Sequence, residues 1–537
     1  MSKLRLINCL LHDPANTVNG QRAELWIADG KIVATPPLPE QSQYTVFDAQ
    51  GHHVMPGGID MHCHIAGPLL QAARRLNIDQ ANQIIPHSTA TGRLFAGMGY
   101  TTAIDAAIPG LQARIAHDEL SRTPILDKGF LLLLGNNHYI LENLAANKID
   151  VVRAYVAWAL TSVKAFGMKI VNPGGVENWK QISRTSIHHL DTPVAGFGVT
   201  PRQIVTTLSQ IADELALPHP LHIHCNNLGM PGNYKTTLDT MKCLEGRRAH
   251  FAHIQFHSYD GSPDDPASFS SAVHHLLDYV HNNRNITIDV GHIVAGNVIT
   301  VSGDAPFSQH LHHLTKKKWF SADIEHESSC GTIPGEFKPY SNLIHAIQWA
   351  IGLEWYLLMQ DPWRIALTSD HPNGGAFLKY PEMVGLLMSH AMRQEMLSRM
   401  PPAVKEKTNL THITREYTLD EIAIITRAAP ARILGLKDKG HLAPGADADI
   451  TIYATQDNIT TMFQRPRYVF KSGTFIAQDG ELTREAETLF SPTLHVSRDY
   501  DQTALTGLHD WMRSNYSIHP GNYAIHDEEI RSPLVRV

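Results

Sequence analysis

The chain has 537 residues, of which 43% are hydrophobic and 18% are charged. This composition is that of a globular protein with a large core, and it excludes a disordered, collagen-like or coiled-coil chain. With a net charge of −7, no long basic run and no stretch of about 18 apolar residues, the chain is expected to bind no nucleic acid and to cross no membrane. The N-terminus lacks a signal-peptide pattern, so we expect a cytoplasmic protein.

The first 58 residues are predicted to form short strands joined by tight turns. Asp29-Gly30 is a dipeptide typical of hairpins, and it lies among three apolar or alternating segments, Leu4–Leu10, Ala23–Ala28 and Lys31–Ala34. The same pattern returns near the other end, at Ala448–Ala454, Arg467–Phe470 and Thr474–Ala477. The two pieces either pair into one small sheet domain or form separate β-rich caps.

Between these pieces, short apolar runs alternate with longer segments of helical period, which is typical of βα units around a parallel sheet. Val151–Phe166 is predicted to be one of the helices. With the segment that enters His62, eight strands are predicted, the others being Tyr100–Ala106, Gly129–Leu134, Gly167–Val171, Pro220–Cys225, His250–Phe256, Ile286–Val290 and Arg364–Ser369. Eight units favour a (β/α)8 barrel over a doubly wound sheet, because no GxGxxG motif follows the first strand. Trp319–Ile324 is either a ninth strand or an insertion.

The last segment, 490–537, is polar and has no clear period. We do not expect it to form a domain of its own. It is expected to wrap over the surface or to contact another subunit.

Metal binding is suggested by histidine, which occurs 33 times and is the commonest transition-metal ligand among side chains. The five cysteines form no CxxC pair, so cysteine-ligated zinc and iron–sulfur clusters are not expected. The strongest local pattern is Pro56-Gly-Gly-Ile-Asp-Met-His62-Cys-His64. Because side chains alternate along a strand, His62 and His64 share one face and can hold one metal ion at the strand end.

This motif resembles the first-strand signature of the amidohydrolase superfamily of metal-dependent hydrolases. The segment Gly440-His-Leu-Ala-Pro-Gly-Ala-Asp-Ala-Asp449 is similar to the superfamily's return into a composite β-sandwich. The resemblance implies an α/β fold in which 59–435 form a (β/α)8 TIM-like barrel and both chain ends, 1–58 and 436–489, form the sandwich.

The superfamily implies further ligands at the strand ends. In the fourth strand it points to Lys169, whose buried amine can capture carbon dioxide and become N6-carboxylysine. Lys164 is less suitable because it lies in the preceding helix. In the fifth strand His222 and His224 share a face, and His224 is preferred because it is nearer the barrel mouth.

The sixth and eighth strands supply the remaining positions. His253 and His257 have the same parity, and His257 is preferred because it stands at the strand end. Asp370 follows the eighth strand. The implied centre therefore holds two zinc ions, which activate water and polarise a carbonyl. Its ligands are His62, His64, Lys169, His224, His257 and Asp370. Asp370 is expected to take a proton from the attacking water and pass it to the leaving nitrogen.

Four longer motifs narrow the resemblance: Lys169–Gly175, His222–Gly229, His253–Tyr259 and Thr368–Gly375. They resemble the amidohydrolase-type subunits of formylmethanofuran dehydrogenases and of bacterial formyltransferase/hydrolase complexes. This resemblance implies hydrolysis of N-formylmethanofuran to formate and methanofuran in one-carbon metabolism, within a complex of several subunits that include a formyltransferase. The low charged fraction favours the bacterial hydrolytic form over a CO2-reducing complex.

Other interpretations remain open from the sequence. One alternative is a cyclic amidase of the dihydropyrimidinase or hydantoinase kind, which would use the same ligands. Another is a scaffold subunit of the complex that has no catalytic activity. Asn226, Asn227, His292 and His371 are further candidates for substrate contacts at the barrel mouth, although a structural role in the loops explains each equally well.

Overall fold

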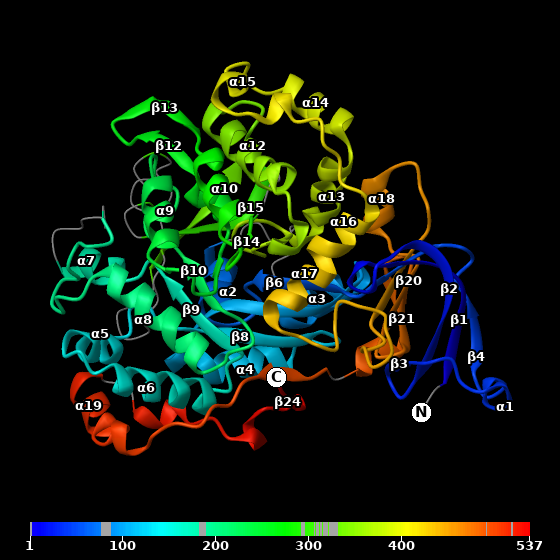
Figure 1. The fold of residues 1–537 in the computed structure, drawn as a ribbon, viewed down its shortest axis with the longest axis horizontal. Coiled ribbons are helices and arrows are strands. Elements are labelled where there is room, and N and C mark those ends of the chain that lie inside the picture. The colour runs from blue at the N-terminus through cyan, green and yellow to red at the C-terminus, as the bar shows by residue number, and fades with distance from the viewer. Residues whose placement is uncertain are drawn as a thin grey trace.

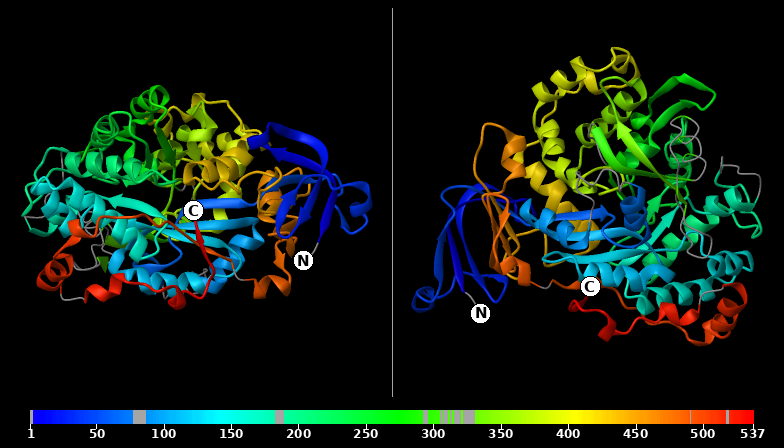
Figure 2. Two further views of the ribbon diagram at one scale, coloured as in Figure 1. Left: turned by 60° about the horizontal axis from the view of Figure 1, so that its bottom comes forward. Right: turned by 180° about the vertical axis from the view of Figure 1, so that it is seen from behind.

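The computed structural model describes residues 3–76, 87–181, 189–291, 296–304, 307, 311, 314, 320–321, 331–489, 491–516 and 519–537. A parallel barrel sheet surrounded by helices lies beside a nine-stranded sheet (Figure 1). Both views of Figure 2 show the N-terminal strands next to strands from residues beyond 440, at one end of the molecule. Among the described residues, no helix has the length and the apolar character needed to cross a membrane.

The barrel consists of eight parallel strands in sequence order: β6 (Gly58–Cys63), β7 (Tyr100–Pro109), β8 (Asp127–Leu133), β9 (Gly167–Val171), β10 (Leu221–His224), β11 (Ala249–Phe251), β14 (Ile286–Asp289) and β18 (Ile365–Ala366). The ring is completed between β18 and β6 by backbone hydrogen bonds just beyond β18. Asp370 N donates to His62 O over 3.0 Å, and His64 N donates to His371 O over 2.6 Å. The predicted TIM-like barrel is confirmed, and candidate site residues themselves close it.

Some of the helices begin at a capping side chain. Asn137 caps α5, Asn342 caps α12, and Thr200 with Gln203 forms a capping box at α8. The helices are α1 (Leu38–Gln41), α2 (Gly67–Leu76), α3 (Ser88–Gly97), α4 (Ala113–Ser121), α5 (His138–Ala145), α6 (Ile149–Ser162), α7 (Gly175–Gln181), α8 (Pro201–Glu214), α9 (Tyr234–Lys242), α10 (Val273–Asn282), α12 (Leu343–Leu358), α13 (Tyr380–Met388), α14 (His390–Ser398), α15 (Val404–Lys407), α16 (Leu419–Ala423), α17 (Ala429–Leu434), α18 (Ile459–Gln464) and α19 (Leu508–Asn515).

The two chain ends form one sheet domain, as the first of the two sequence interpretations predicted. Its strands are β1 (Leu4–Asp13), β2 (Val18–Ala28), β3 (Lys31–Val33), β4 (Thr45–Asp48), β5 (His53–Pro56), β19 (Ile450–Tyr453), β20 (Tyr468–Lys471), β21 (Thr474–Gln478) and β22 (Glu481–Leu482). The ends meet where β5 pairs with β19, with Val54 opposite Ile452. The ring of Phe47 on β4 meets the rings of Tyr468 and Phe470 edge-on, with centroids 4.9 and 5.2 Å away, so side chains of the two ends also pack together.

An insertion follows β14, and the segment Trp319–Ile324, whose role the sequence left open, belongs to it. Within it, β16 (Phe320–Ser321) pairs with β17 (Gly331–Phe337), which also pairs with β15 (Gly296–Gly303). These strands form a sheet separate from the barrel, so this segment is not a ninth barrel strand. A hairpin of β12 (Tyr259–Ser262) and β13 (Asp265–Ser271) is likewise separate.

The tail wraps along the outside of the barrel near α5 and α6 (Figure 1). It adds β23 (Thr493–His495) and β24 (Leu534–Arg536) to the barrel sheet, with Thr493 beside Lys128 of β8. Trp511 Nε1 on α19 donates to Glu142 Oε2 on α5 over 2.7 Å. The expected contact of the tail with another subunit remains a prediction.

A buried ionic cluster joins the sheet domain to the barrel. Lys471 Nζ on β20 lies 2.9 Å from Asp127 Oδ2 of β8 and 2.9 Å from Asp449 Oδ2. Lys439 Nζ lies 3.1 Å from the same Asp449 oxygen. Although burial opposes ionisation, the two ammonium groups hold the pKa of Asp449 well below its usual range. The charged Asp449 thus helps to hold the two lysines of the sheet domain against Asp127 of the barrel.

Replacing this carboxylate should weaken the junction. Asp449→Asn is expected to lower the free energy of unfolding by roughly 1–3 kcal/mol, since it removes one of the two buried carboxylates that pair with both lysines and leaves only Asp127 to face the two. Urea unfolding measures the change. The matched control is Glu24→Gln, which breaks the exposed Arg5–Glu24 pair and should cost less than about 1 kcal/mol. Equal losses in the two variants would contradict a special role for the buried cluster.

Candidate metal centre

A cavity at the carboxyl end of the barrel strands gathers the potential metal ligands. Six titratable side chains line it: His62, His64, Lys169, His224, His253 and Asp370. Its remaining wall is mostly apolar and consists of Leu69, Ala107, Val171, Leu228, Phe256, Phe307 and Phe337, with Gln348 and Gly374. This is the end at which barrel enzymes place their active sites.

The predicted pair, His62 on β6 and His64 directly after it, meets Asp370. His64 Nε2 lies 3.1 Å and His62 Nε2 lies 3.7 Å from Asp370 Oδ1. One ligand atom of each of the three lies within 4.8 Å of the others. These are the distances expected of side chains that can share one cation.

Asp370 reaches this position through a turn in the left-handed region, with φ of 48°. Its carbonyl accepts a hydrogen bond from Gly374 N over 2.9 Å. A side chain at position 374 would place its Cβ only 2.5 Å from Asp370 Oδ2. Glycine at this position therefore leaves room for the carboxylate.

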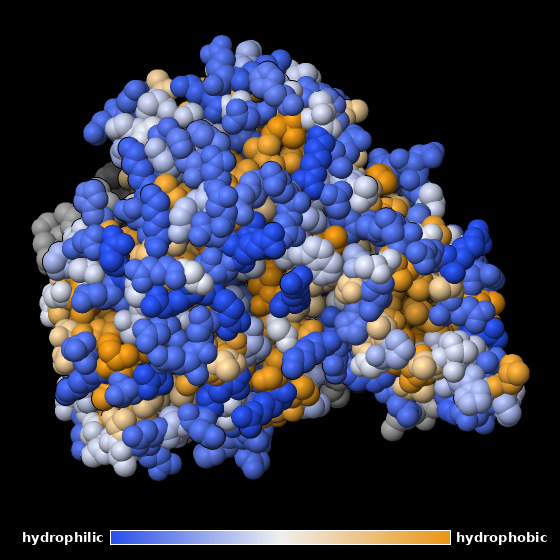
Figure 3. Space-filling view, in the orientation of Figure 1, coloured by the Kyte–Doolittle hydropathy of each residue, from blue (hydrophilic) through white to orange (hydrophobic). Residues whose placement is uncertain are grey.

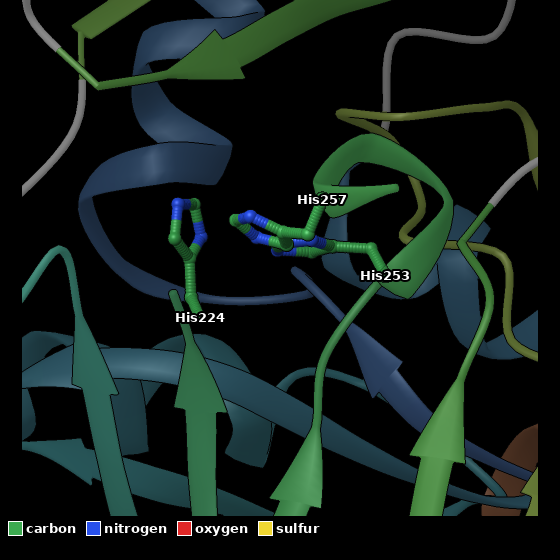
Figure 4. Close-up of side chains that lie close together, drawn as sticks. All are labelled: His224, His253 and His257. Atoms are coloured by element: carbon green, nitrogen blue, oxygen red, sulfur yellow. The ribbon is translucent and has the colours of Figure 1, made fainter. Parts of the chain in front are cut away.

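A second group of ligands comes from β10 and the turn after β11. Figure 4 shows His224 at the end of β10, facing the rings of His253 and His257. The centroid of the His224 ring lies 4.6 Å from that of His253 and 5.2 Å from that of His257. One ligand atom of each lies within 4.8 Å of the others, and all three residues are buried.

The structure corrects the local geometry that we expected for His253 and His257. The strand ends at Phe251, His253 takes a left-handed conformation with φ of 30°, and Ile254–His257 form a 3-10 helical turn. The two histidines therefore do not share a strand face. They meet because the turn stacks one ring on the other, with centroids 5.3 Å apart.

Only one of these two histidines lines the cavity. His253 does so, and its ring lies 5.2 Å from that of His62. His257 lies outside the lining, and both its ring nitrogens are buried without a hydrogen-bond partner among the described residues. Both histidines belong to the ligand group of His224, and His253, unlike the sequence candidate His257, also borders the cavity.

The two lysine candidates lie in different places, Lys169 within the fourth strand and Lys164 before it. Lys169 is 1% exposed, lines the cavity and stands beside His222 in the register of β9 and β10. Lys164 precedes β9 and pairs with Asp527 of the tail at 2.9 Å. The structure thus brings Lys169 to the cluster and separates Lys164 from it.

Electrostatics suit this cluster to a cation. Burial, reinforced by nearby positive groups that include Lys169, holds the pKa values of His224, His253 and His257 well below the usual range. These imidazoles are therefore neutral and offer lone pairs. His64 differs, because Asp105 and Asp370 outweigh its burial and raise its pKa to about 9. Neutral imidazoles beside a carboxylate form a donor set that fits zinc-type ions.

Two polar residues that the sequence analysis missed also belong to this region. Asp289, at the end of β14, is fully buried and accepts hydrogen bonds from the His62 and His250 rings, each over 3.0 Å. Gln348 lines the cavity from α12, and its Oε1 is buried without a partner among the described residues. A single charged or amide side chain within an apolar strand or helix is the signal that could have found both.

The three proposed mouth residues that the structure describes, Asn226, Asn227 and His371, do not line the cavity. The Asn226 amide donates to Asn172 Oδ1 and Pro173 O, at 2.9 and 3.0 Å, which ties two loops together. Asn227 donates to Thr236, and His371 accepts from Phe377 N. Each therefore serves a loop contact in the structure, while His292 lies outside the described residues.

Comparison with known sequences assigns the chain to a family. The model described as "Amidohydrolase family" matches residues 45–477. The chain is 37% identical to Protein FwdA of Methanocaldococcus jannaschii, over 98% of this chain and 97% of that protein. It is 38% identical to the A component of the formyltransferase/hydrolase complex Fhc of Methylorubrum extorquens, over 86% of this chain and 85% of that component.

Comparison with solved structures agrees with this assignment. A chain in the crystal structure of the formyltransferase/hydrolase complex FhcABCD from Methylorubrum extorquens, determined with methylofuran, matches with a TM-score of 0.92 and 33% identity. The match covers 100% of this chain and 99% of that one. Sequence, barrel and site together show that the chain belongs to the amidohydrolase family.

Proposed function

We propose that the chain is the hydrolytic subunit of a formyltransferase/hydrolase complex and hydrolyses N-formylmethanofuran to formate and methanofuran. The observation that carries the proposal is the cavity, where side chains from the ends of β6, β9 and β10 meet those that follow β11 and β18. The near full-length similarity to the A component of the Fhc complex supports the same kind of substrate and partners, including a formyltransferase subunit.

The residues present fit a binuclear zinc centre. His62, His64, His224, His253 and Asp370 would hold two Zn²⁺ ions, with Lys169 joining them once carboxylated. Zinc supplies a Lewis acid for the amide carbonyl and lowers the pKa of water. A carboxylated Lys169 would also replace a buried positive charge with a negative one beside neutral imidazoles.

The protein's own groups would orient the amide and move its proton. Asp370 borders the cavity and is placed to take a proton from the attacking water and deliver it to the leaving nitrogen. Gln348 Oε1 can accept a hydrogen bond from the amide N–H of the substrate. Phe256, Phe307 and Phe337 exclude bulk water from this wall of the cavity.

A CO2-reducing complex remains the second candidate, because the similarity to FwdA is as high as that to the Fhc component. The chemistry assigned to this chain would be the same in both, since the difference lies in the partner subunits. No observation favours a cyclic amidase. An inactive scaffold would lack ligands, whereas every predicted ligand position is filled here.

Lys169 offers a test of the carboxylated bridge. Lys169→Ala should lose activity and bound zinc, because the bridging oxygen ligand is absent, and should recover part of both when short-chain carboxylic acids are added. Metal analysis and formate release measure the two effects. The control is Lys164→Ala, which changes the ion pair with the tail and should bind wild-type amounts of zinc. Intact-mass analysis of an active sample with an unmodified Lys169 would contradict the prediction.

The choice between the two stacked histidines can be tested by metal content. His253→Ala is expected to remove about one zinc ion per chain, since it takes away a ligand that faces the cavity. His257→Ala, its matched control, should keep both ions and lose only packing. Retention of zinc by His253→Ala together with its loss from His257→Ala would restore the assignment made from the sequence.

Asp370 tests the reaction itself. Asp370→Asn keeps the shape and one oxygen, so it should retain most of the zinc while kcat for N-formylmethanofuran falls ~10²–10⁴-fold. Formate release per bound metal pair, measured in the complex with its partners, reports the change. If the wild-type chain in that complex releases no formate, the proposed function is wrong. If the variant turns over like the wild type, only the role of Asp370 is wrong.

A further inference from the structure

We propose that Asp289 is the positioning residue of the metal centre, which holds His62 in the tautomer that presents Nε2 to the metal. This inference rests on the proposed function. Asp289 does not line the cavity, so it acts through His62 and not on the substrate.

The Asp289 carboxylate is surrounded by donors from three other parts of the barrel. One oxygen accepts from His62 Nδ1 of β6 and from His250 Nε2 of β11, each over 3.0 Å. The other accepts from Thr368 Oγ1 over 3.0 Å and from the backbone N–H of His253 over 2.8 Å. Because Asp289 is 0% exposed, bulk water does not compete for these contacts. The same carboxylate thus touches two of the proposed ligands, His62 and His253.

The two nitrogens of the His62 ring face different partners. Nδ1 faces Asp289, whereas Nε2 points to the cavity and lies 3.7 Å from Asp370 Oδ1. An ionised carboxylate can only accept, so His62 must carry its hydrogen on Nδ1. The lone pair is then on Nε2, where a metal ion would bind.

Hydrogen bonds restrict the rotation of the Asp289 carboxylate. The backbone N–H of His253 fixes one of its oxygens, because a main-chain donor in a folded turn has no freedom to rotate. On the other side, the His250 ring is held by its second nitrogen, 2.9 Å from Thr287 Oγ1. His222 Nε2 lies 3.7 Å from the carboxylate, and its other ring nitrogen contacts His219 over 3.0 Å. A layer of imidazoles therefore supports the metal ligands from below.

Asparagine at this position would reverse the tautomer. Its oxygen would stay with the backbone N–H of His253, which leaves the amide NH2 facing His62 Nδ1 and His250 Nε2. His62 would then have to accept at Nδ1 and carry its hydrogen on Nε2, toward the metal. Asp289→Asn is nearly isosteric, so the expected loss comes from hydrogen-bond direction and not from a cavity.

The experiment measures zinc affinity by chelator competition in the full-length wild type and in Asp289→Asn, with thermal unfolding of both metal-free forms. We expect the affinity of the His62 site to fall about 10–100-fold, as is typical when the outer partner of a metal-binding histidine is lost. The matched control is Thr287→Val, which removes a hydrogen bond from the same buried layer but leaves Asp289 facing His62. It should lower the unfolding temperature without changing zinc affinity.

The outcomes separate the two proposals. If the wild type binds no zinc, the proposed metal centre fails. If the wild type binds two ions and Asp289→Asn binds them with unchanged affinity, Asp289 has only a structural role and the inference is overturned. Should Asp289→Asn not fold, a crystal structure of the zinc-loaded wild type decides the question. We expect the ion on His62 Nε2 with Asp289 at Nδ1, and an ion bound to Nδ1 would overturn the inference.

Discussion

A carboxylate buried in the middle of a protein must be hydrogen-bonded on every side, and in this barrel that requirement falls on Asp289. Its donors come from β6, from the β11 strand and the turn after it, and from the segment after β18. These parts of the chain are far apart in sequence and converge directly below the candidate metal centre. An unpaired carboxylate in this place would cost several kcal/mol, so the four contacts fix the height and rotation of the strands around it.

The same coupling of fold and site appears where the barrel closes. β18 and β6 meet through the backbone of His62, His64, Asp370 and His371, which are ligand candidates or their neighbours. The residues that close the barrel are therefore the ones that form the candidate site, or their neighbours. The left-handed conformation of Asp370 is tolerated because hydrogen bonds on both sides of its peptide hold the turn.

Burial explains why so many imidazoles can lie close together. Desolvation disfavours the imidazolium form, so the rings of His222, His224, His253 and His257 remain neutral at contact distances that charged rings would not accept. The surface has the hydropathy that is usual for a globular protein. The face in Figure 3 is largely hydrophilic, with apolar residues in small groups. The neutral imidazoles of the candidate centre lie in the inner layers at the carboxyl ends of the barrel strands.

Periodicity in the sequence predicted the barrel, whereas the pairing of the chain ends and most of the ligand candidates came from the resemblance of its motifs to the amidohydrolase superfamily. Periodicity is a local property, and the His62–His64 and Asp370 motifs are contiguous, so both could be read without coordinates. The left-handed turn at His253 could not, because nothing in the local pattern ends the strand at Phe251. Asp289 and Gln348 stand out in the sequence only as single polar side chains within apolar segments, which does not by itself assign them to the site. Each is a lone polar residue whose meaning depends on donors and walls contributed by distant strands, and only tertiary packing brings those together.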